Sequence, residues 1–247
     1  TKDQIIKICD RNFIGCDQLI FIESSKSSDA NLKFFNSDGG ESGACGNGTR
    51  CIAKLISNET KNETIILTTL NGNLKSQILE NNIVTTEIGN AKIKWNEIPL
   101  SEKLDTKNLN IKIIDVNDKE YLGGTAVNVG NPHVVFFVDE IENFNIEKIG
   151  PQVENYNIFP EKCNVTIAKI VDKNLIKVKV WERGAGLTKA CGTAACATAF
   201  AGKLNNLTEN KTDIEFQTGR LSIFIDDKDS IHMKGPVSEI KKIEIKL

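Results

Sequence analysis

Ala44-Cys45-Gly46-Asn47-Gly48-Thr49-Arg50 occurs in a second form later in the chain, as Ala190-Cys191-Gly192-Thr193-Ala194-Ala195. Each copy places a cysteine after a glycine-containing turn, at the start of a segment that we expect to be helical. The first backbone N–H groups of a helix are unpaired and carry a partial positive charge. Such a position can bind a carboxylate and stabilise a thiolate. Two equivalent cysteines therefore indicate a pair that acts on one substrate from two sides.

Polar residues upstream of the two cysteines keep matching distances. Gln18 precedes Asn36 by 18 residues, and Asn36 precedes Cys45 by nine. Because the period of this repeat exceeds 100 residues, it indicates a duplicated domain and not a solenoid. A duplicated domain would place two equivalent sites at a cleft, where ligand pockets are common. In the second half the same separations of 18 and nine residues join Asn164, Glu182 and Cys191.

The composition is that of an ordinary soluble protein. The chain has 247 residues and a net charge of −2, with 40% hydrophobic and 26% charged residues. Neither a nucleic-acid surface nor an acidic tail is indicated by this charge. No apolar run approaches the roughly 20 residues of a membrane span, and the first residues do not resemble a signal peptide. We therefore expect a cytoplasmic protein that binds neither nucleic acid nor membranes.

Cysteine usage narrows the possible chemistry. Reduced thiols are expected in such a chain. No two cysteines have the C-x-x-C spacing, and the only histidines are His133 and His232, so we expect no metal site. We expect Cys45 and Cys191 to carry chemistry and the other five cysteines to pack in the structure: Cys9, Cys16, Cys51, Cys163 and Cys196.

Hydrophobic periodicity predicts many short strands and few helices. A domain crossing is expected between residues 90 and 110, and two further strands should finish the chain. We predict helices over 1–11, 45–56, 144–149 and 191–204, and strands over 19–22, 32–35, 64–69, 74–79, 83–88, 111–116, 124–129, 134–138, 164–171, 175–181, 213–217 and 221–225.

The paired cysteines suggest a two-sided proton transfer. A thiolate at one helix start can remove a proton from one face of a carbon, and a thiol at the other can return a proton to the opposite face. This geometry inverts a stereocentre next to a carboxylate. Backbone N–H groups at both helix starts could stabilise the charge that develops. We expect the helix N-terminus to bring the pKa of each cysteine near the working pH.

Four motifs resemble the signatures of the diaminopimelate epimerase family, along essentially the whole chain. They are Phe35-Asn36-Ser37-Asp38-Gly39, Cys45-Gly46-Asn47-Gly48-Thr49-Arg50-Cys51, Gly130-Asn131-Pro132-His133, and the run from Glu182-Arg183-Gly184-Ala185-Gly186 through Ala190-Cys191-Gly192-Thr193. The resemblance implies a pyridoxal phosphate-independent epimerase that interconverts LL- and meso-2,6-diaminopimelate, in lysine and peptidoglycan biosynthesis. It implies no cofactor and a cytoplasmic homodimer.

The resemblance also implies a fold and a domain organisation. The expected class is α+β, with two pseudo-symmetric domains, each a mainly antiparallel barrel-like sheet around a central helix. The first domain should comprise residues 1–92 together with a returning strand at 238–247. The second should comprise residues 93–237.

Individual roles follow from the same resemblance. Cys191 would deprotonate the LL isomer and Cys45 would reprotonate it, with these roles exchanged in the reverse direction. His133 and Glu182 would tune the two thiols. The reacting carboxylate would be held by Gly46, Asn47, Gly192 and Thr193. The distal end of the substrate would be bound by Asn36, Asn131, Asn164, Glu182 and Arg183, and Gln18 would also line the site.

One feature of the family has no counterpart in the sequence. Family members begin with a strand whose asparagine contacts the substrate, and the internal repeat places the equivalent residue about 15 positions before Thr1. The only methionine is Met233. We therefore expect an N-terminally truncated chain.

Three alternatives stay open at this point. A proline racemase-type enzyme would also use two cysteines but usually has histidine in place of Asn47. A thiol redox or thiolate–metal protein would need closer cysteine pairs than Cys45–Cys51 and Cys191–Cys196. An inactive amino-acid-binding module is the third.

Overall fold

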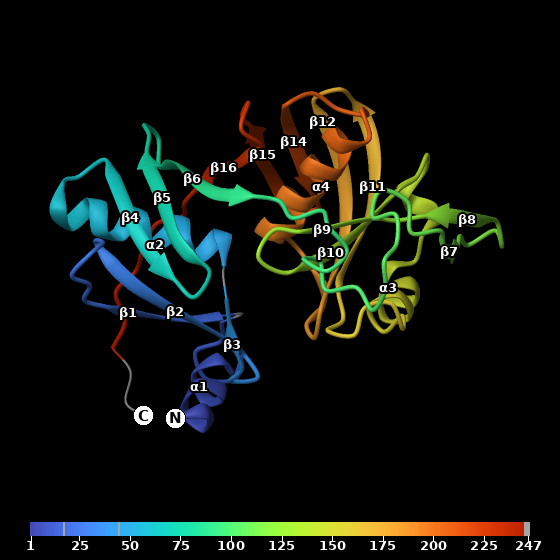
Figure 1. The fold of residues 1–247 in the computed structure, drawn as a ribbon. Coiled ribbons are helices and arrows are strands. Elements are labelled where there is room, and N and C mark those ends of the chain that lie inside the picture. Colours follow the sequence, from blue (N-terminus) through green and yellow to red (C-terminus); the bar gives the residue numbers. More distant parts are fainter. Residues whose placement is uncertain (17, 44, 245–247) are drawn as a thin grey trace. The chain divides into compact units, whose positions relative to one another are not determined.

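A computed structural model of the chain describes residues 1–16, 18–43 and 45–244, which form two compact units (Figure 1). Unit 1 contains Thr1–Glu87 and the C-terminal segment that begins at Pro236, and unit 2 contains Ile88–Gly235. The chain passes between the units twice, within β6 (Ile83–Asn90) and at the end of β16 (Ser230–Pro236).

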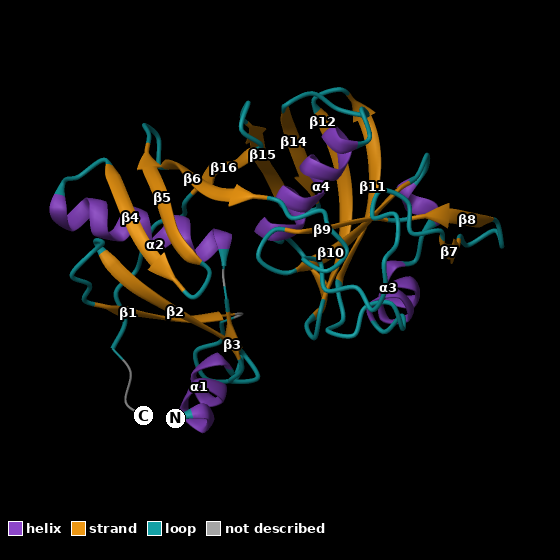
Figure 2. Cartoon of the chain, viewed as in Figure 1, coloured by secondary structure: helices purple, strands orange, loops and turns teal. Residues whose placement is uncertain are grey.

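Unit 1 is a mainly antiparallel sheet with one long helix packed on it. The strand order is β1-β2-β4-β5-β6, and β3 pairs with β2. Only the β2–β4 pair is parallel among these. Helix α2 packs against β4 and β5 (Figure 2). The elements are α1 (Lys2–Cys9), β1 (Gln18–Glu23), β2 (Ala30–Asn36), β3 (Glu41–Ser42), α2 (Gly46–Thr60), β4 (Thr64–Thr69) and β5 (Gly72–Ile78), followed by β6.

Unit 2 has a larger sheet with the order β16-β15-β14-β12-β11-β10-β9, and β13 pairs with β12. The pairs β10–β11 and β12–β14 are parallel, and β7 and β8 form a separate hairpin. The elements are β7 (Ile111–Ile114), β8 (Glu120–Gly123), β9 (Thr125–Asn128), β10 (Pro132–Phe137), a 3₁₀ turn (Ile141–Asn143), α3 (Ile146–Glu154), β11 (Asn164–Asp172), β12 (Leu175–Glu182), β13 (Gly186–Thr188), α4 (Gly192–Leu204), β14 (Lys211–Phe216), β15 (Gly219–Ile225) and β16.

Helices α3 and α4 cover opposite faces of the central strands of unit 2. Successive side chains of a strand point to opposite faces of its sheet. Val135 and Val180 accordingly pack in the core that contains α4, whereas Val134 and Val165 pack in the core that contains α3. This alternation decides which functional side chains can meet at each helix.

The central helices of the two units differ in depth. Ten of the 13 residues of α4 are buried, and its first turns are rich in alanine. Helix α2 has 15 residues, of which five are buried; the others are partly buried, except for residues 58–60 at its end, which are exposed.

The two units repeat one order of elements. Strands β1 and β2, a short strand on β2, helix α2 and strands β4 to β6 correspond to β11, β12, β13, α4 and β14 to β16. In both units the first two long strands pair antiparallel, the second pairs parallel with the strand after the helix, and an antiparallel pair follows. The predicted α+β class is confirmed.

Two strand predictions need correction. The strand expected at 238–247 is absent from residues 238–244, because Pro236 cannot donate a ladder hydrogen bond and the polar segment after it is mostly exposed. Val237 alone packs in the unit 1 core, and its N–H donates to Asn82 O at 2.9 Å. Residues 245–247 lie outside the described residues, as does Ala44 of the cysteine motif.

The second correction concerns the strand predicted over 19–22, whose run of four apolar residues indicates a buried strand. Strand β1 is at the end of the strand order in unit 1, and Phe21 and Ile22 are almost half exposed. A run of apolar residues does not distinguish an edge strand from an interior one. Among the described residues, no helix combines the length and the apolar composition needed to cross a membrane.

Candidate active site

Cys45 is the N-cap residue of α2, as the motif predicts. Its backbone is extended, and its Sγ accepts a hydrogen bond from Gly48 N at 3.3 Å. A Cβ on Gly48 would lie 2.4 Å from Ile20 Cδ1 and 3.2 Å from Cys45 Sγ, so a larger residue here would have to displace the Ile20 side chain. The half-buried thiol is therefore held at the first turn of α2, next to β1.

Gln18 and Asn36 lie directly opposite each other on β1 and β2. Gln18 Nε2 donates to Asn36 Oδ1 at 2.9 Å. Gln18 shares a face of β1 with Ile20, the residue that contacts Gly48, so the amide pair and the start of α2 belong to one side of the sheet. The 18-residue spacing in the sequence thus corresponds to a cross-strand pair.

Gly46 and Asn47 form the first turn of α2 after the cysteine. Asn47 Oδ1 accepts a hydrogen bond from Arg50 Nη2 at 2.7 Å, and Arg50 is buried. The first backbone bond of the helix runs from Thr49 N to Cys45 O at 2.8 Å. The N–H groups of Gly46 and Asn47 precede this bond, which is the arrangement that suits an anion.

Cys191 holds the equivalent N-cap position of α4 and is buried. Its Sγ lies 3.4 Å from Thr193 Oγ1. Burial, and then the nearby Glu182 carboxylate, raise the pKa of the Cys191 thiol, whereas Thr193 and the Ala194 N–H act in the opposite direction. The prediction that the helix start brings this pKa near the working pH is therefore wrong for Cys191, because burial outweighs the helix terminus.

His133 is fully buried, and its Nε2 lies 2.9 Å from Asn131 Oδ1. Burial, with the positive charge of Arg183, lowers the pKa of His133 to about 3, so the ring is neutral at pH 7. An amide oxygen can only accept, so Nε2 carries the proton and Nδ1 is the acceptor. Nδ1 has no hydrogen-bond partner among the described residues.

Asn164 lies beside His133 in the parallel register of β10 and β11. Its Nδ2 donates to Pro132 O at 2.9 Å, and its Oδ1 accepts from Arg183 N at 3.0 Å. The buried amide therefore joins the Asn131–His133 segment to the turn that carries Arg183.

Glu182 ends β12, and Arg183 begins the turn after it. Glu182 has the strand parity of Val180, which packs on the α4 side, consistent with its effect on the Cys191 thiol. Arg183 is exposed, and its Nη1 donates to Glu161 O at 2.7 Å. The eight predicted residues of unit 2 thus lie in the turn before β10, on β10 and β11, at the end of β12, in the turn after it, or at the start of α4.

Two residues that the sequence interpretation did not single out support this turn. Glu154 of α3 and Trp181 of β12 form a hydrogen bond at 2.7 Å, and Glu154 also binds the turn backbone at Gly184. The contacts join residues 27 and 30 positions apart, so no local pattern could reveal them.

The remaining thiols lie in packed or paired positions. Burial raises the pKa of Cys51 and of Cys163. Cys16 donates to Cys9 Sγ at 3.4 Å. Within the described ranges, no group of three or more histidine, cysteine or acidic residues is arranged to hold a metal ion.

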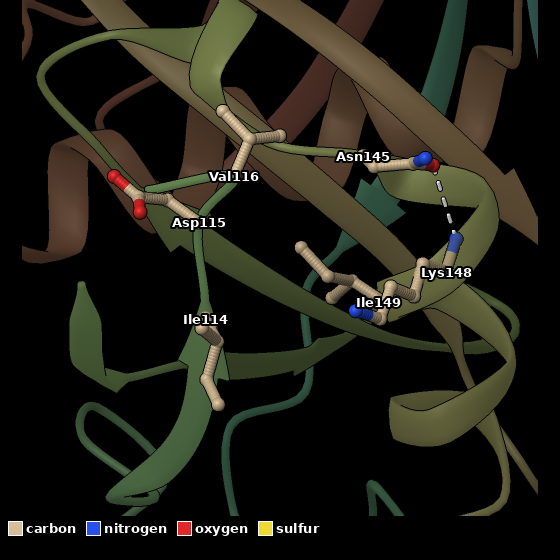
Figure 3. A pocket seen from close by; sticks show the side chains of 6 residues that line it. All are labelled: Ile114, Asp115, Val116, Asn145, Lys148 and Ile149. Atoms are coloured by element: carbon tan, nitrogen blue, oxygen red, sulfur yellow. Dashed lines mark hydrogen bonds between the residues drawn. The ribbon is translucent and has the colours of Figure 1, made fainter. Parts of the chain in front are cut away.

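A cavity of about 250 Å³ lies in unit 2 between the end of β7 and the start of α3 (Figure 3). None of the predicted site residues lines it. Its polar groups serve local structure, since Asn145 Oδ1 accepts from Lys148 N and Asp115 Oδ1 accepts from Asn117 N and Lys119 N. We therefore keep the two cysteine helix starts as the candidate site. The lining residues are Ile114, Asp115, Val116, Asn145, Lys148 and Ile149.

A sequence model of one protein family, described as diaminopimelate epimerase, matches residues 1–94 and 125–240. The chain belongs to the diaminopimelate epimerase family. Diaminopimelate epimerase of Pelagibacter ubique is 66% identical over 246 residues, which cover 100% of this chain and 90% of that protein. The enzyme of Acidiphilium cryptum is 38% identical over 97% of this chain and 85% of its own length. As a member of the diaminopimelate epimerase family, the chain is an isomerase.

Two solved structures share the fold at much lower sequence identity. A hydroxyproline epimerase from Agrobacterium vitis superposes with a TM-score of 0.68 at 11% identity, over 95% of this chain and 76% of that one. A phenazine biosynthesis protein of the PhzF family from Bacillus anthracis gives 0.65 at 16%, over 99% and 90%. At such identities the likeness concerns the diaminopimelate epimerase fold alone.

Proposed function

We propose that this chain interconverts LL- and meso-2,6-diaminopimelate without a cofactor, with Cys45 and Cys191 as the two acid/base groups. One observation carries the roles of the cysteines: each is the N-cap residue of the central helix in its own unit, after the same order of strands. Membership of the diaminopimelate epimerase family supports the substrate.

In this proposal, Cys191 removes the α-proton of the LL isomer and Cys45 delivers a proton to the opposite face. Because burial and Glu182 raise its pKa, Cys191 is a thiol before the substrate binds and must first lose its proton. Glu182, whose carboxylate acts on the Cys191 thiol, could accept this proton. The neutral His133, with Nδ1 as an acceptor, is a second candidate.

The carboxylate next to the reacting carbon would bind at the two helix starts. Gly46 and Asn47 precede the first helical bond of α2, and Gly192 and Thr193 hold the same place before the bond from Ala195 N to Cys191 O at 3.0 Å. These N–H groups would also stabilise the negative charge that develops on deprotonation. The distal ammonium and carboxylate of the substrate would be recognised by Gln18, Asn36, Asn131, Asn164, Glu182 and Arg183.

Replacing each cysteine tests the proposal. Cys45→Ser and Cys191→Ser should each lower kcat for epimerisation by a factor of about 10²–10⁴, the usual contribution of a positioned acid or base. The conversion is followed by the change of optical rotation, and by ¹H NMR in D₂O, where the wild-type enzyme should place solvent deuterium at the α-carbon. Proline offered as the substrate should show no exchange.

Two cysteines inside the same helices serve as matched controls. Cys51→Ser in α2 and Cys196→Ala in α4 change a thiol that lies about one turn or more beyond the N-cap, and both should retain activity. Normal epimerisation by Cys45→Ser or Cys191→Ser would contradict the two-base mechanism.

Domain assignment, assembly and location are also proposals. We propose that units 1 and 2 correspond to the two epimerase domains predicted at residues 1–92 with 238–247 and at 93–237. We further propose a cytoplasmic homodimer, as is usual in the family. Light scattering coupled to gel filtration tests the assembly: a mass near 55 kDa is expected, twice the 27.3 kDa of one chain.

A further inference from the structure

Glu154, the last residue of α3, is a buried carboxylate that binds the strand end and the turn carrying Glu182 and Arg183. It is 5% exposed. Its Oε2 accepts a hydrogen bond from Trp181 Nε1 at 2.7 Å, and its Oε1 accepts from Gly184 N at 3.2 Å. The two donors stand immediately before and immediately after Glu182 and Arg183 in the chain. One carboxylate therefore fixes both ends of this dipeptide.

The two bonds require a carboxylate and not merely a polar side chain. Both groups facing Glu154 are N–H donors, so the site needs two acceptor oxygens. A glutamine of the same shape would offer one acceptor and turn its NH₂ group toward the other donor. Lys162 Nζ, 3.8 Å from Oε1, supplies a partial counter-charge. Burying a carboxylate is costly without such partners, so its presence here points to a specific task.

Close packing of α3 on β12 brings the indole within reach of the carboxylate. A Cβ on Gly150 would lie 2.3 Å from Trp181 Cγ, so the indole rests directly on the helix backbone. Gly150 is four residues before Glu154 and hence on the same helix face. Gly150 therefore allows α3 to pack closely on the Trp181 indole, and Glu154 fixes the orientation of that ring.

Because side chains alternate along a strand, a fixed position of Trp181 on one face of the sheet also constrains Glu182 on the other face. Trp181 packs on the α3 side, and Glu182, the next residue, has the parity of the α4 side. Gly184 has a φ of +73°, a conformation that favours glycine, and Ala185 N closes the turn onto Glu182 O at 3.0 Å. Fixing Trp181 and Gly184 therefore leaves Glu182 little freedom.

We propose that Glu154 is a positioning residue for the epimerase reaction, which holds Glu182 and Arg183 in place from the α3 side of the sheet. This inference rests on the substrate-binding roles proposed above for Glu182 and Arg183. Glu154 itself lies on the α3 side and acts through Trp181 and Gly184.

Glu154→Gln, Trp181→Phe and the double variant test this role, with Glu147→Gln as the matched control on the exposed face of α3. Trp181→Phe removes the indole N–H but keeps an aromatic ring. We expect KM for diaminopimelate to rise about tenfold in each single variant, the effect of losing one hydrogen bond to a charged group. The double variant should raise KM by less than the product of the two single effects, because both substitutions disturb the Glu154–Trp181 bond. Glu147→Gln should match the wild type.

Hydrogen–deuterium exchange of the full chain without substrate gives a readout that does not depend on catalysis. Amides of residues 182–186 should exchange at least about threefold faster in Glu154→Gln and Trp181→Phe, and at the wild-type rate in Glu147→Gln. If Glu154→Gln fails to fold by circular dichroism, Trp181→Phe decides the question by the same two measurements.

Each further outcome has one meaning. Unchanged KM together with unchanged exchange overturns the role of Glu154. A lower kcat with unchanged KM and unchanged exchange at 182–186 also overturns it, since that result indicates only a smaller folded fraction. If the wild-type chain does not turn over diaminopimelate, the proposed function fails, while faster exchange at 182–186 still supports the contact between Glu154 and the turn.

Discussion

At the scale of single residues, the fully buried imidazole of His133 has the clearest physical signature. Its Nε2 pairs with Asn131, and burial together with the charge of Arg183 lowers its pKa to about 3. An unfolded chain would protonate the same ring near pH 6.5. The ring is thus neutral in the folded protein throughout the range in which histidine normally titrates.

This difference predicts how stability depends on pH. Below about pH 6.5 the unfolded state binds a proton that the folded state does not, so the free energy of unfolding falls as the pH falls toward 3. We expect the loss between pH 7 and pH 5 to be about 1–2 kcal/mol smaller in His133→Gln than in the wild type. Urea unfolding at the two pH values measures it.

An equal pH dependence in His133→Gln and the wild type would mean that His133 is not kept neutral by the fold.

Among elements, the contact between α3 and β12 depends on the smallest side chain. A methyl group on Gly150 would lie 2.3 and 2.5 Å from two ring atoms of Trp181, which the partly buried indole cannot accommodate without moving. Overpacking of this kind typically costs about 1–3 kcal/mol. We therefore expect Gly150→Ala to lower the free energy of unfolding by about 2 kcal/mol, measured by urea denaturation.

Gly123 at the end of β8 is the control for the same substitution. A Cβ there would meet no atom within 4 Å. Gly123→Ala should change the free energy of unfolding by less than about 0.5 kcal/mol. If the two variants are equally stable, the close packing of α3 on Trp181 is not as described.

The sequence predicted elements best where local pattern and tertiary environment agree. The apolar run in Thr64–Thr69 predicted the bounds of β4 correctly, and its Ile65 and Leu67 face the core. Helix α3 was predicted to end at Ile149, but it continues through Pro151 to Glu154. Buried Val153 and Glu154 hold this last turn, and their partners are distant in the chain. Strand β8 was missed because Glu120–Gly123 is short and carries no strong alternation.

For the whole molecule, duplication was the most informative signal. The separations around Cys45 and Cys191 anticipated two helix starts behind equivalent strands, because a conserved order of elements keeps sequence distances fixed. The sequence separations did not show how deeply each cysteine is buried. Burial of Cys191, the charge on Glu182 beside it, and the bond from Glu154 to Trp181 all depend on which elements pack together.

The unequal burial of α2 and α4 predicts different rates of local opening for the two helices. A helix buried on nearly all sides can open only when its surroundings open, whereas a helix with an exposed end can fray from that end. We expect backbone amides of residues 196–204 to exchange with solvent deuterium at the rate of global unfolding. Amides of residues 54–60, at the outer end of α2, should exchange faster by local opening.

Native-state exchange at low urea concentrations distinguishes the two regimes. The exchange rate of amides 196–204 should rise with urea concentration as steeply as global unfolding does. The exchange rate of amides 54–60 should hardly depend on urea. Equal urea dependence of the two segments would contradict the difference in burial. The two thiols proposed to act on one substrate would then stand on helices that open at different rates. Cys45 would lie on a helix that opens locally and often, and Cys191 on a helix that opens only when its whole unit unfolds.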